Sequence, residues 1–150
     1  VRCPRGAQRA IPESIKPTFE DFDVFGDEKA EKAIVTYGRT FSACAFAYEK
    51  LLNAGESVKL IKLNRIIPVC EGAVEAAKTC RDVYFFEEGI RRGGAGEGFL
   101  FDLSKAGFGG KYHLRAIENG FVKQASVESL LHEYGFDEEG VLSFIASAED

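Results

Sequence analysis

The sequence predicts an α/β protein, a three-layer α/β/α sandwich built on a mostly parallel sheet of four or five strands. Short apolar runs alternate with longer amphipathic stretches, which is typical of βαβ units whose helices cover both faces of a sheet. The chain has 150 residues, the size of one ordinary domain, and 45% of them are hydrophobic while 29% are charged. This composition excludes disordered, collagen-like and disulfide-scaffold proteins.

Strands are expected where short apolar runs are bounded by glycine, proline or polar turn residues. Lys32–Tyr37 ends directly before Gly38, and Asp82–Phe86 is almost entirely apolar, which favours a place in the centre of the sheet. In chain order, the expected strands are residues 22–25, 32–37, 58–63, 82–86 and 112–117.

Helices are expected between and after these strands, where capping residues mark their starts and glycines their ends. Thr40, Ser126 and Asp137 are the expected N-caps of three helices, and Gly55 and Gly135 are expected to end two of them. The expected helices are residues 40–53, 70–80, 95–105, 126–134 and 137–147.

Charge is unevenly distributed along the chain, although the net charge is only −5. Residues 1–12 carry three arginines and no acid, whereas residues 126–150 carry seven acids and neither lysine nor arginine. An acidic domain without a long basic stripe is not expected to bind nucleic acid, because that affinity comes largely from neutralised phosphates. No run approaches the ~20 apolar residues of a membrane span, so we expect no membrane contact and a cytoplasmic location.

The four cysteines are expected to be reduced and to bind no metal. They lie far apart, without a C-x-x-C pair, and only His113 and His132 accompany them, so the clustered ligands of a zinc site are missing. Cys44 and Cys80 fall within expected helices, which indicates buried packing residues. No motif places a nucleophile beside either histidine, so we expect no catalytic residue in this chain.

A glycine-rich stretch stands between the expected strand at residues 82–86 and the expected helix at residues 95–105. Gly93, Gly94 and Gly96 lie where backbone N–H groups at a helix N-terminus can hold an anion, but their spacing fails the G-x-G-x-x-G pattern of dinucleotide sites. The same glycines would let the helix pack closely against the sheet or against another subunit. The sequence leaves both interpretations open.

Two adjacent acids, Glu87 and Glu88, begin an expected turn that ends at Gly89, at the carboxyl end of a central strand. Ligand-binding groups gather at this end of the strands in α/β proteins, and two close carboxylates can share acid/base work because their pKa values are driven apart. Alternatively, one acid is buried against backbone or a neighbouring subunit and the other is solvated.

Arg5 stands between Pro4 and Gly6, on a turn that is stiff and then flexible. A guanidinium there can bind a phosphate or carboxylate with two hydrogen bonds. A solvated basic terminus is the alternative interpretation.

Five short motifs follow one another along the chain. They are Arg2 to Gly6, Ile34 to Gly38, Phe86 to Gly89 with Gly93 to Gly96, Gln124 to Ser126 after Phe121, and Gly135 to Asp137. In order and spacing they resemble the C-terminal part of the 1-deoxy-D-xylulose-5-phosphate synthase family. Enzymes of that family are transketolase-like and depend on thiamine diphosphate.

This resemblance implies a transketolase C-terminal-type domain over residues 18–150, preceded at residues 1–17 by the tail of a pyrimidine-binding domain and a linker. The family condenses pyruvate with glyceraldehyde 3-phosphate, with loss of CO₂, for isoprenoid precursor synthesis. Arg5 matches an arginine that binds the substrate phosphate. Thiamine diphosphate and Mg²⁺ are held upstream, so the resemblance implies an inactive, cofactor-free piece that contacts its own N-terminal and middle domains within a homodimer.

At two places the sequence departs from the family pattern, and these departures leave open which substrate the protein uses. Residues 64–68 read Asn-Arg-Ile-Ile-Pro where the family has Arg-Phe-x-Lys-Pro, and Glu118-Asn119 replaces Pro-Asp. The alternatives are a free-standing α/β module that holds a phosphorylated ligand or a partner, the terminal domain of a 2-oxo acid dehydrogenase β-subunit, and another transketolase-like enzyme.

Overall fold

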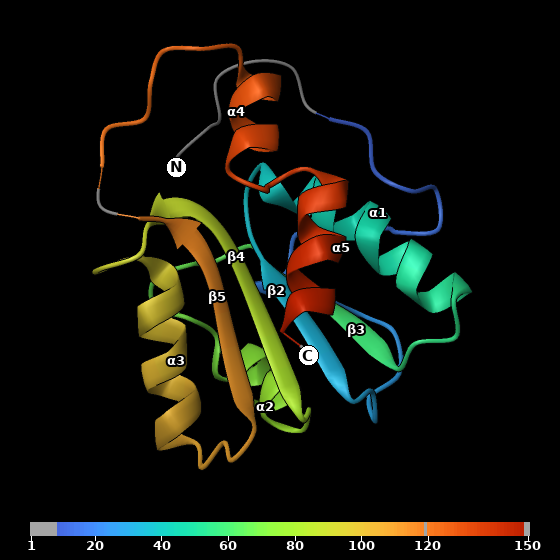
Figure 1. Cartoon of the computed structure of the whole chain (residues 1–150). Helices are drawn as coiled ribbons and strands as arrows, with labels where there is room; N and C mark the ends of the chain where they lie inside the picture. The colour runs from blue at the N-terminus through green and yellow to red at the C-terminus, as the bar shows by residue number, and fades with distance from the viewer. Residues whose placement is uncertain (1–8, 119, 149–150) are drawn as a thin grey trace.

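The chain forms a five-stranded sheet between two layers of helices (Figure 1). This is seen in a computed structural model, which describes residues 9–118 and 120–148. The strands are β1 (Phe22–Phe25), β2 (Lys32–Thr36), β3 (Val58–Leu63), β4 (Asp82–Ile90) and β5 (Lys111–Ile117). The helices are α1 (Thr40–Asn53), α2 (Glu71–Lys78), α3 (Ala95–Lys105), α4 (Val127–Glu133) and α5 (Glu138–Ser147). The predicted α/β/α fold is confirmed.

The sheet has the strand order β1-β3-β2-β4-β5. The four strands β3, β2, β4 and β5 are parallel, so all of them end at one side of the sheet, which we call the carboxyl edge. β1 runs antiparallel to β3, and Phe22 at its start lies opposite Leu63 at the end of β3. The segment that precedes β1 therefore also lies at the carboxyl edge.

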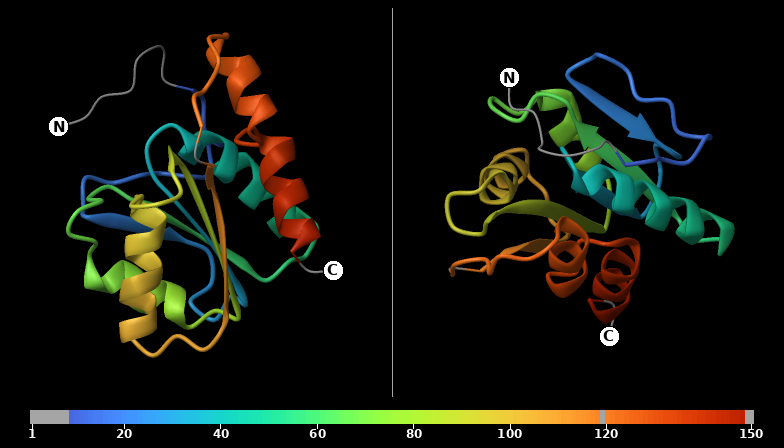
Figure 2. Two further views of the ribbon diagram at one scale, coloured as in Figure 1. Left: turned by 60° about the vertical axis from the view of Figure 1, so that its left-hand side comes forward. Right: turned by 90° about the horizontal axis from the view of Figure 1, so that it is seen from above.

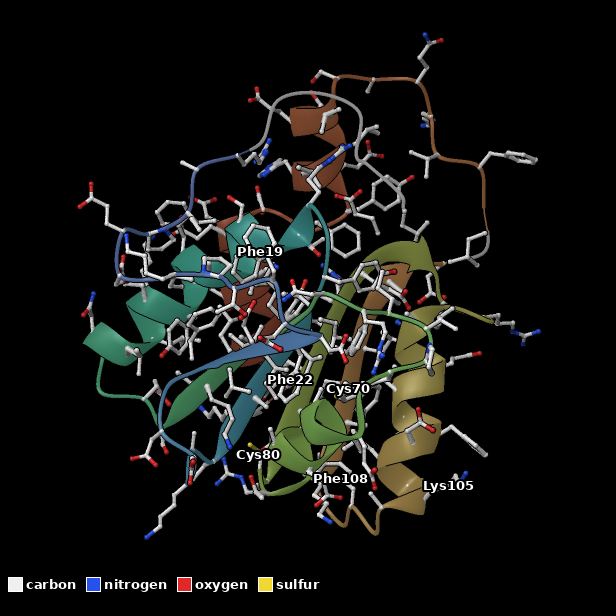
Figure 3. The ribbon with its side chains drawn as sticks, turned by 180° about the vertical axis from the view of Figure 1, so that it is seen from behind. Phe19, Phe22, Cys70, Cys80, Lys105 and Phe108 are labelled. Carbon is white, nitrogen blue, oxygen red and sulfur yellow. The ribbon has the colours of Figure 1, made fainter. Side chains whose placement is uncertain are left out.

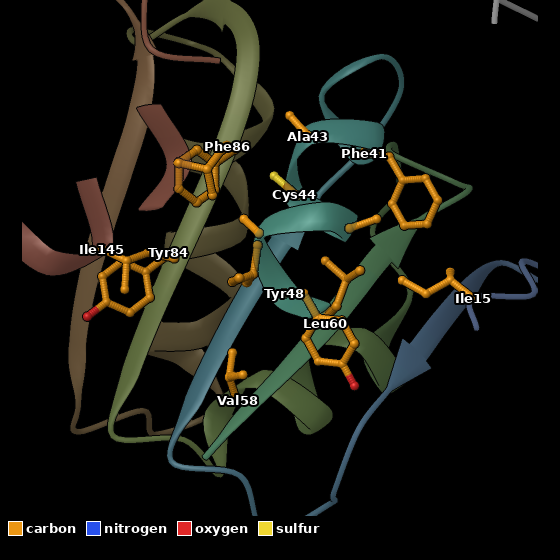
Figure 4. Close-up of a cluster of buried hydrophobic side chains, with 14 residues drawn as sticks. Ile15, Phe41, Ala43, Cys44, Tyr48, Val58, Leu60, Tyr84, Phe86 and Ile145 are labelled. Atoms are coloured by element: carbon orange, nitrogen blue, oxygen red, sulfur yellow. The ribbon is translucent and has the colours of Figure 1, made fainter. Parts of the chain in front are cut away.

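Side chains alternate between the two faces of each strand, and each face has its own hydrophobic core. Ile34 and Tyr84 face α1 and α5, whereas Val35 and Phe85 face α2 and α3. Figure 2 shows these two helix pairs on opposite sides of the sheet, and Figure 4 shows the α1 and α5 side. β2 is buried along its whole length, because it lies between β3 and β4 and is covered on both faces.

Part of the segment before β1 packs on this domain. Ile15 is buried in the core beneath α1, where Figure 4 shows it next to Phe41 and Leu60. The Ser42 hydroxyl donates to the carbonyl of Ala10 at 2.5 Å. The division of the chain at residue 17 stays a prediction.

The prediction that Thr40 caps α1 is wrong. Thr40 is the first residue of the helix, and the N-cap position belongs to Arg39, whose side chain makes no capping hydrogen bond. The buried hydroxyl of Thr40 instead donates to the carbonyl of Tyr37 at 2.8 Å and lies 2.7 Å from Oγ1 of Thr36. It ties the start of the helix to the end of β2.

The prediction of a turn at Glu87 to Gly89 is also wrong, because β4 continues to Ile90. The pairing with β5 is irregular between Phe86 and Ile90, after which Ile90 lies opposite Ile117. The backbone N–H of Arg91 then donates to the carbonyl of Ile117 at 2.9 Å. This late contact with β5 keeps the strand extended through the two acids.

The cysteines Cys44 and Cys80 are buried, as predicted, and together with Cys70 they are free thiols. Cys80, however, lies just after α2, which ends at Lys78, and not within the helix. Burial raises the pKa of the Cys44 thiol to about 12, so it is protonated at neutral pH and acts as a small packing residue. Within the described ranges, no helix is long and apolar enough to cross a membrane.

An ion pair between His132 and Asp137 joins α4 to α5. Nδ1 of His132 lies 2.6 Å from Oδ2 of Asp137, and the other oxygen of Asp137 caps α5 by accepting from the N–H of Gly140 at 2.8 Å. The hydrogen bond and then the charge of Asp137 raise the pKa of His132 above its ordinary value of 6.5.

We therefore expect the domain to lose stability as the pH rises through the neutral range. A histidine whose pKa is raised on folding stabilises the folded chain fully below its unfolded pKa, and this contribution disappears as the pH rises through the folded-state pKa. Urea midpoints measured at about pH 5.5 and about pH 8.5 should differ less for His132→Gln than for the unchanged chain. An identical pH dependence in both proteins would exclude this role for the pair.

Candidate functional site

The candidate site lies at the carboxyl edge, where the end of β4 meets the start of α3. Parallel strands bring residues that are distant in the sequence together at this edge, which is where α/β proteins bind their ligands. Tyr37 follows β2, Glu87 lies near the end of β4, and Gly93 to Gly96 lead into α3. The site is built from these three segments.

The carboxylate of Glu87 lies at the N-terminus of α3. Its side chain is 1% exposed, and its two carboxylate oxygens accept hydrogen bonds from the N–H groups of Ala95 and Gly96, both at 3.0 Å. The hydroxyl of Tyr37 donates a third hydrogen bond at 2.9 Å. The N-cap residue of α3 is Gly94, which has no side chain, so Glu87 reaches across from β4 and takes the role of a capping carboxylate.

The glycines of this loop make room for that carboxylate. A Cβ atom on Gly94 would lie 2.5 Å from both Oε1 of Glu87 and the carbonyl oxygen of Ile90. A Cβ atom on Gly96 would lie 3.0 Å from Oε1 of Glu87. Gly93 has a φ of 74°, which favours glycine, and its N–H donates to Glu97 at 2.7 Å. The N–H groups of Gly93, Ala95 and Gly96 are thus used by two acids of the chain itself and not by an external anion.

Tyr112 supports the same helix start from β5. Its hydroxyl donates to the carbonyl of Gly96 at 2.7 Å. Burial, and then the charge of Glu87, raise the pKa of Tyr112 well above its ordinary value of 10, so the phenol stays protonated and remains a donor. Tyr37, Glu87 and Tyr112 together hold the first turn of α3 against the sheet.

Glu88 has a different environment from Glu87. Neighbouring residues of a strand point to opposite faces, so Glu88 points away from α3, and its half-exposed side chain lies 3.9 Å from Nε of Arg39. One acid is buried against backbone N–H groups and the other lies at the surface. The two carboxylates do not face one another, and this arrangement supplies no acid/base pair.

Arg91 closes the open side of β5 at the same edge. Its Nη2 donates to the carbonyl of Leu114 at 2.8 Å, and its Nε donates to Glu118 at 2.7 Å. β5 is an edge strand, and a guanidinium on its backbone carbonyl prevents another strand from pairing there. Arg91 therefore protects the sheet as well as linking β4 to β5.

The described residues form hollows near the carboxyl edge. A groove of about 720 Å³ runs between α2 and α3, with Ile67 and Gly94 toward the edge and Glu75 and Asp102 along it. Figure 3 shows the two helices from behind, with Cys70 at the start of α2 and Lys105 at the end of α3. A smaller hollow of about 160 Å³ lies between the sheet end and α4.

The other residues singled out in the sequence lie elsewhere. His113 contacts Asp82 at 3.2 Å near the opposite, amino edge of the sheet, and His132 lies on α4. Arg5 lies outside the described residues. Across residues 9–118 and 120–148, no three histidine, cysteine or acidic side chains are grouped so that they could hold a metal ion.

Sequence reasoning missed Tyr37 and Tyr112. Both are single aromatic residues within expected strands, and nothing in the local pattern distinguishes them from core residues. The only available signal is topological. Tyr37 follows a strand parallel to β4, so its side chain is placed at the same edge as Glu87.

The sequence profile of the transketolase C-terminal domain family matches residues 26–141. A 1-deoxy-D-xylulose-5-phosphate synthase of Corynebacterium jeikeium (strain K411) is 25% identical over 146 residues, which cover 94% of this chain and 23% of that protein. The synthase of Bacillus mycoides (strain KBAB4) is 32% identical over 124 residues, covering 79% of this chain and 19% of that protein. The chain therefore spans about a fifth of the length of the curated relatives it matches.

The structure of this chain is also similar to that of a solved transketolase. This solved structure is described as a split-gene transketolase, an inactive tetramer of the beta type (beta4). It matches with a TM-score of 0.77 and 21% identity, over 92% of this chain and 46% of that one. This likeness shows the fold, and the family profile covers most of the described elements. The chain belongs to the transketolase C-terminal domain family, and its sequence relatives include the C-terminal parts of 1-deoxy-D-xylulose-5-phosphate synthases.

Proposed function

We propose that this chain is the C-terminal domain of a 1-deoxy-D-xylulose-5-phosphate synthase-like transferase, which condenses pyruvate with glyceraldehyde 3-phosphate with loss of CO₂. The observation that carries the proposal is the sequence similarity to synthases over most of this chain, at 25% and 32% identity. Because those relatives are about five times longer, the proposed enzyme has further domains upstream of residue 1.

Within that enzyme, the described part of this chain has a structural role. The diphosphate of thiamine diphosphate would need free N–H groups and a metal ion, but the start of α3 is occupied by Glu87 and the described residues present no group of three metal ligands. The described residues therefore do not fit the cofactor. We propose that the upstream domains hold thiamine diphosphate and Mg²⁺ in a cytoplasmic homodimer.

The direct test is an assay of the parent protein and of the present chain under the same conditions. The parent, supplied with thiamine diphosphate and Mg²⁺, should form deoxyxylulose phosphate and release CO₂ from pyruvate. The 150-residue chain alone should form none. A parent protein that transfers the two-carbon unit only from a ketose phosphate would instead indicate a transketolase.

Arg5 provides a sharper test within the parent enzyme. If Arg5 binds the phosphate of glyceraldehyde 3-phosphate, Arg5→Ala removes a charge-assisted contact and should raise the KM for that substrate about tenfold or more. The KM for pyruvate, which carries no phosphate, should change little.

Arg9→Ala is the matched control for this experiment. Arg9 lies in the same basic segment, but it pairs weakly with Glu128 of α4 at 3.9 Å. Its removal should leave both KM values almost unchanged. Equal effects of Arg5→Ala on both substrates would remove Arg5 from its proposed role.

A further inference from the structure

The helix α4 is held to the domain by a single buried side chain. Of its residues only Leu131 is buried, whereas α5 buries both Val141 and Ile145 in the core. The chain is exposed without interruption from residue 120 to residue 129, which includes the start of α4. Figure 1 shows α4 beyond the carboxyl edge, at the top of the view. A helix this short is not stable by itself, so its position depends on very few contacts.

A mostly apolar hollow lies beneath α4. This space of about 160 Å³ is lined from the helix by Val127, Leu130 and Leu131. Ile117, at the end of β5, lines it from the sheet. Side chains that border an unfilled space lack partner atoms on that side and gain less dispersion energy than closely packed ones. Movement of α4 away from the sheet therefore breaks few contacts.

Gly135 connects α4 to α5 and is fixed on the domain. Its φ of 69° favours glycine, and a Cβ atom at this position would collide with the guanidinium of Arg115 on β5. The next residue, Phe136, is 2% exposed. The chain is thus anchored directly after α4, while the helix itself is held loosely. Gly135 is therefore the point about which α4 can turn.

An ion pair spans this hinge. His132 lies three residues before Gly135 and Asp137 two residues after it, and Nδ1 of the histidine is 2.6 Å from Oδ2 of the acid. A second and longer ion pair joins Glu128 of α4 to Arg9 at 3.9 Å. The short contact across the hinge thus depends on a histidine, whose charge changes near neutral pH.

We propose that α4 is a lid over the hollow, hinged at Gly135 and latched by His132 and Asp137, and that it opens while α5 and the sheet stay folded. The open lid uncovers the apolar side chains that line the hollow, and the closed lid covers them. Every part of this lid lies within the described residues, so its opening does not depend on the reaction of the parent enzyme.

The charged groups around the latch favour protonation of His132. Asp137 and Glu139 act on it from α5, Glu128 lies one turn before it on α4, and Arg9 is paired with Glu128. The hydrogen bond to Asp137, and then the charge of that carboxylate, raise the pKa of His132 above 6.5. The latch is therefore complete below the ordinary pKa and is lost as the pH rises through the raised pKa. The lid should open more often in mildly alkaline solution.

Hydrogen exchange of the purified parent protein, followed by mass spectrometry, tests the lid because it measures how often each helix opens. Exchange is corrected for the intrinsic effect of pH on the amide chemistry. The equilibrium constant for opening of α4 should then rise about two- to fivefold between about pH 6 and about pH 8.5. Peptides from α5 should exchange far more slowly than peptides from α4. Equally slow exchange of both helices, or an opening constant of α4 that is the same at both pH values, would overturn the proposal.

Variants of the parent protein test the latch and the hinge separately. His132→Gln should raise the opening constant of α4 at about pH 6 to its value at about pH 8.5, and Glu133→Gln, at the exposed neighbouring residue, is the matched control that should keep the pH dependence. Leu131→Ala removes the buried anchor and should open α4 at both pH values while exchange of α5 stays slow. An unchanged pH dependence in His132→Gln would exclude the latch. Exchange of α5 that rises in step with that of α4 in Leu131→Ala would show that the two helices unfold together, which contradicts a lid.

Discussion

Replacement of Glu87 by alanine is expected to destabilise the domain by about 3–5 kcal/mol. The substitution removes three hydrogen bonds at once and leaves the N–H groups of Ala95 and Gly96 without their acceptor in a buried site. It also deprives the N-terminus of α3 of the negative charge that offsets the helix dipole. Urea unfolding, followed by circular dichroism, measures the loss as a lower midpoint with an unchanged slope.

Two other variants distinguish this role from a simple effect of removing an acid. Glu88→Ala should cost no more than ~0.5 kcal/mol, because Glu88 is half-exposed and its contact with Arg39 is long. Glu87→Gln keeps one oxygen acceptor in the same place and should fall between the two alanine variants. Equal losses for Glu87→Ala and Glu88→Ala would show that the buried hydrogen bonds do not support the fold.

Gly96→Ala should destabilise the domain by about 2–3 kcal/mol. The new methyl group would run into the Leu114 side chain and lie 3.1 Å from Cδ1 of Phe85 and 3.0 Å from Oε1 of Glu87. The partly exposed Leu114 side chain can shift, but Glu87 and Phe85 are fully buried and have no free space to move into. α3 therefore has to move away from the sheet, and its hydrogen bonds to Glu87 lengthen.

Gly98→Ala is the matched control on the same helix. A Cβ atom at Gly98 would meet nothing within 4 Å, so alanine brings only its higher helix propensity. We expect a gain of about 0.5–1 kcal/mol. The two alanine substitutions, two residues apart, should therefore change the free energy of unfolding in opposite directions. A loss of stability in both would mean that the close approach of Gly96 to the sheet is not the cause.

Much of the fold could be predicted because it depends on residues close together in the chain. β1, β3, α1 and α3 have the predicted bounds. The caps predicted for the last two helices are confirmed, since Ser126 accepts from the N–H of Ser129 and Asp137 from the N–H of Gly140. Each of these contacts spans three residues, so the sequence contains both partners in one window.

Lys59 illustrates what local patterns could not predict. β3 reads Val-Lys-Leu-Ile-Lys-Leu, and a lysine within a strand normally indicates a position that faces water. However, Lys59 is 1% exposed, and its ammonium group donates to the carbonyls of Glu28 and Ala76 and to the hydroxyl of Thr79. β3 lies inside the sheet, between β1 and β2, and this pairing joins segments that are distant in the sequence.

In the candidate site, too, the sequence predicts the local features but not the contacts between separate segments. The sequence placed the glycines at the start of a helix and the two acids at the end of a strand, and it left anion binding and close packing as alternatives. In the structure the loop packs closely around an anion that belongs to the chain itself. No local pattern contains this contact, because Glu87 lies on β4 while Ala95 and Gly96 lie on α3, eight and nine residues further along the chain.

By itself, the sequence determined the fold class, the order of its elements and the family resemblance, since periodicity, caps and motifs are properties of neighbouring residues. Only the tertiary structure decided which of the two acids is buried and which groups it binds. The hydrogen bond from Tyr37 to Glu87 joins residues 50 positions apart. Such contacts depend on strand order and direction, which place residues from separate segments at one edge of the sheet.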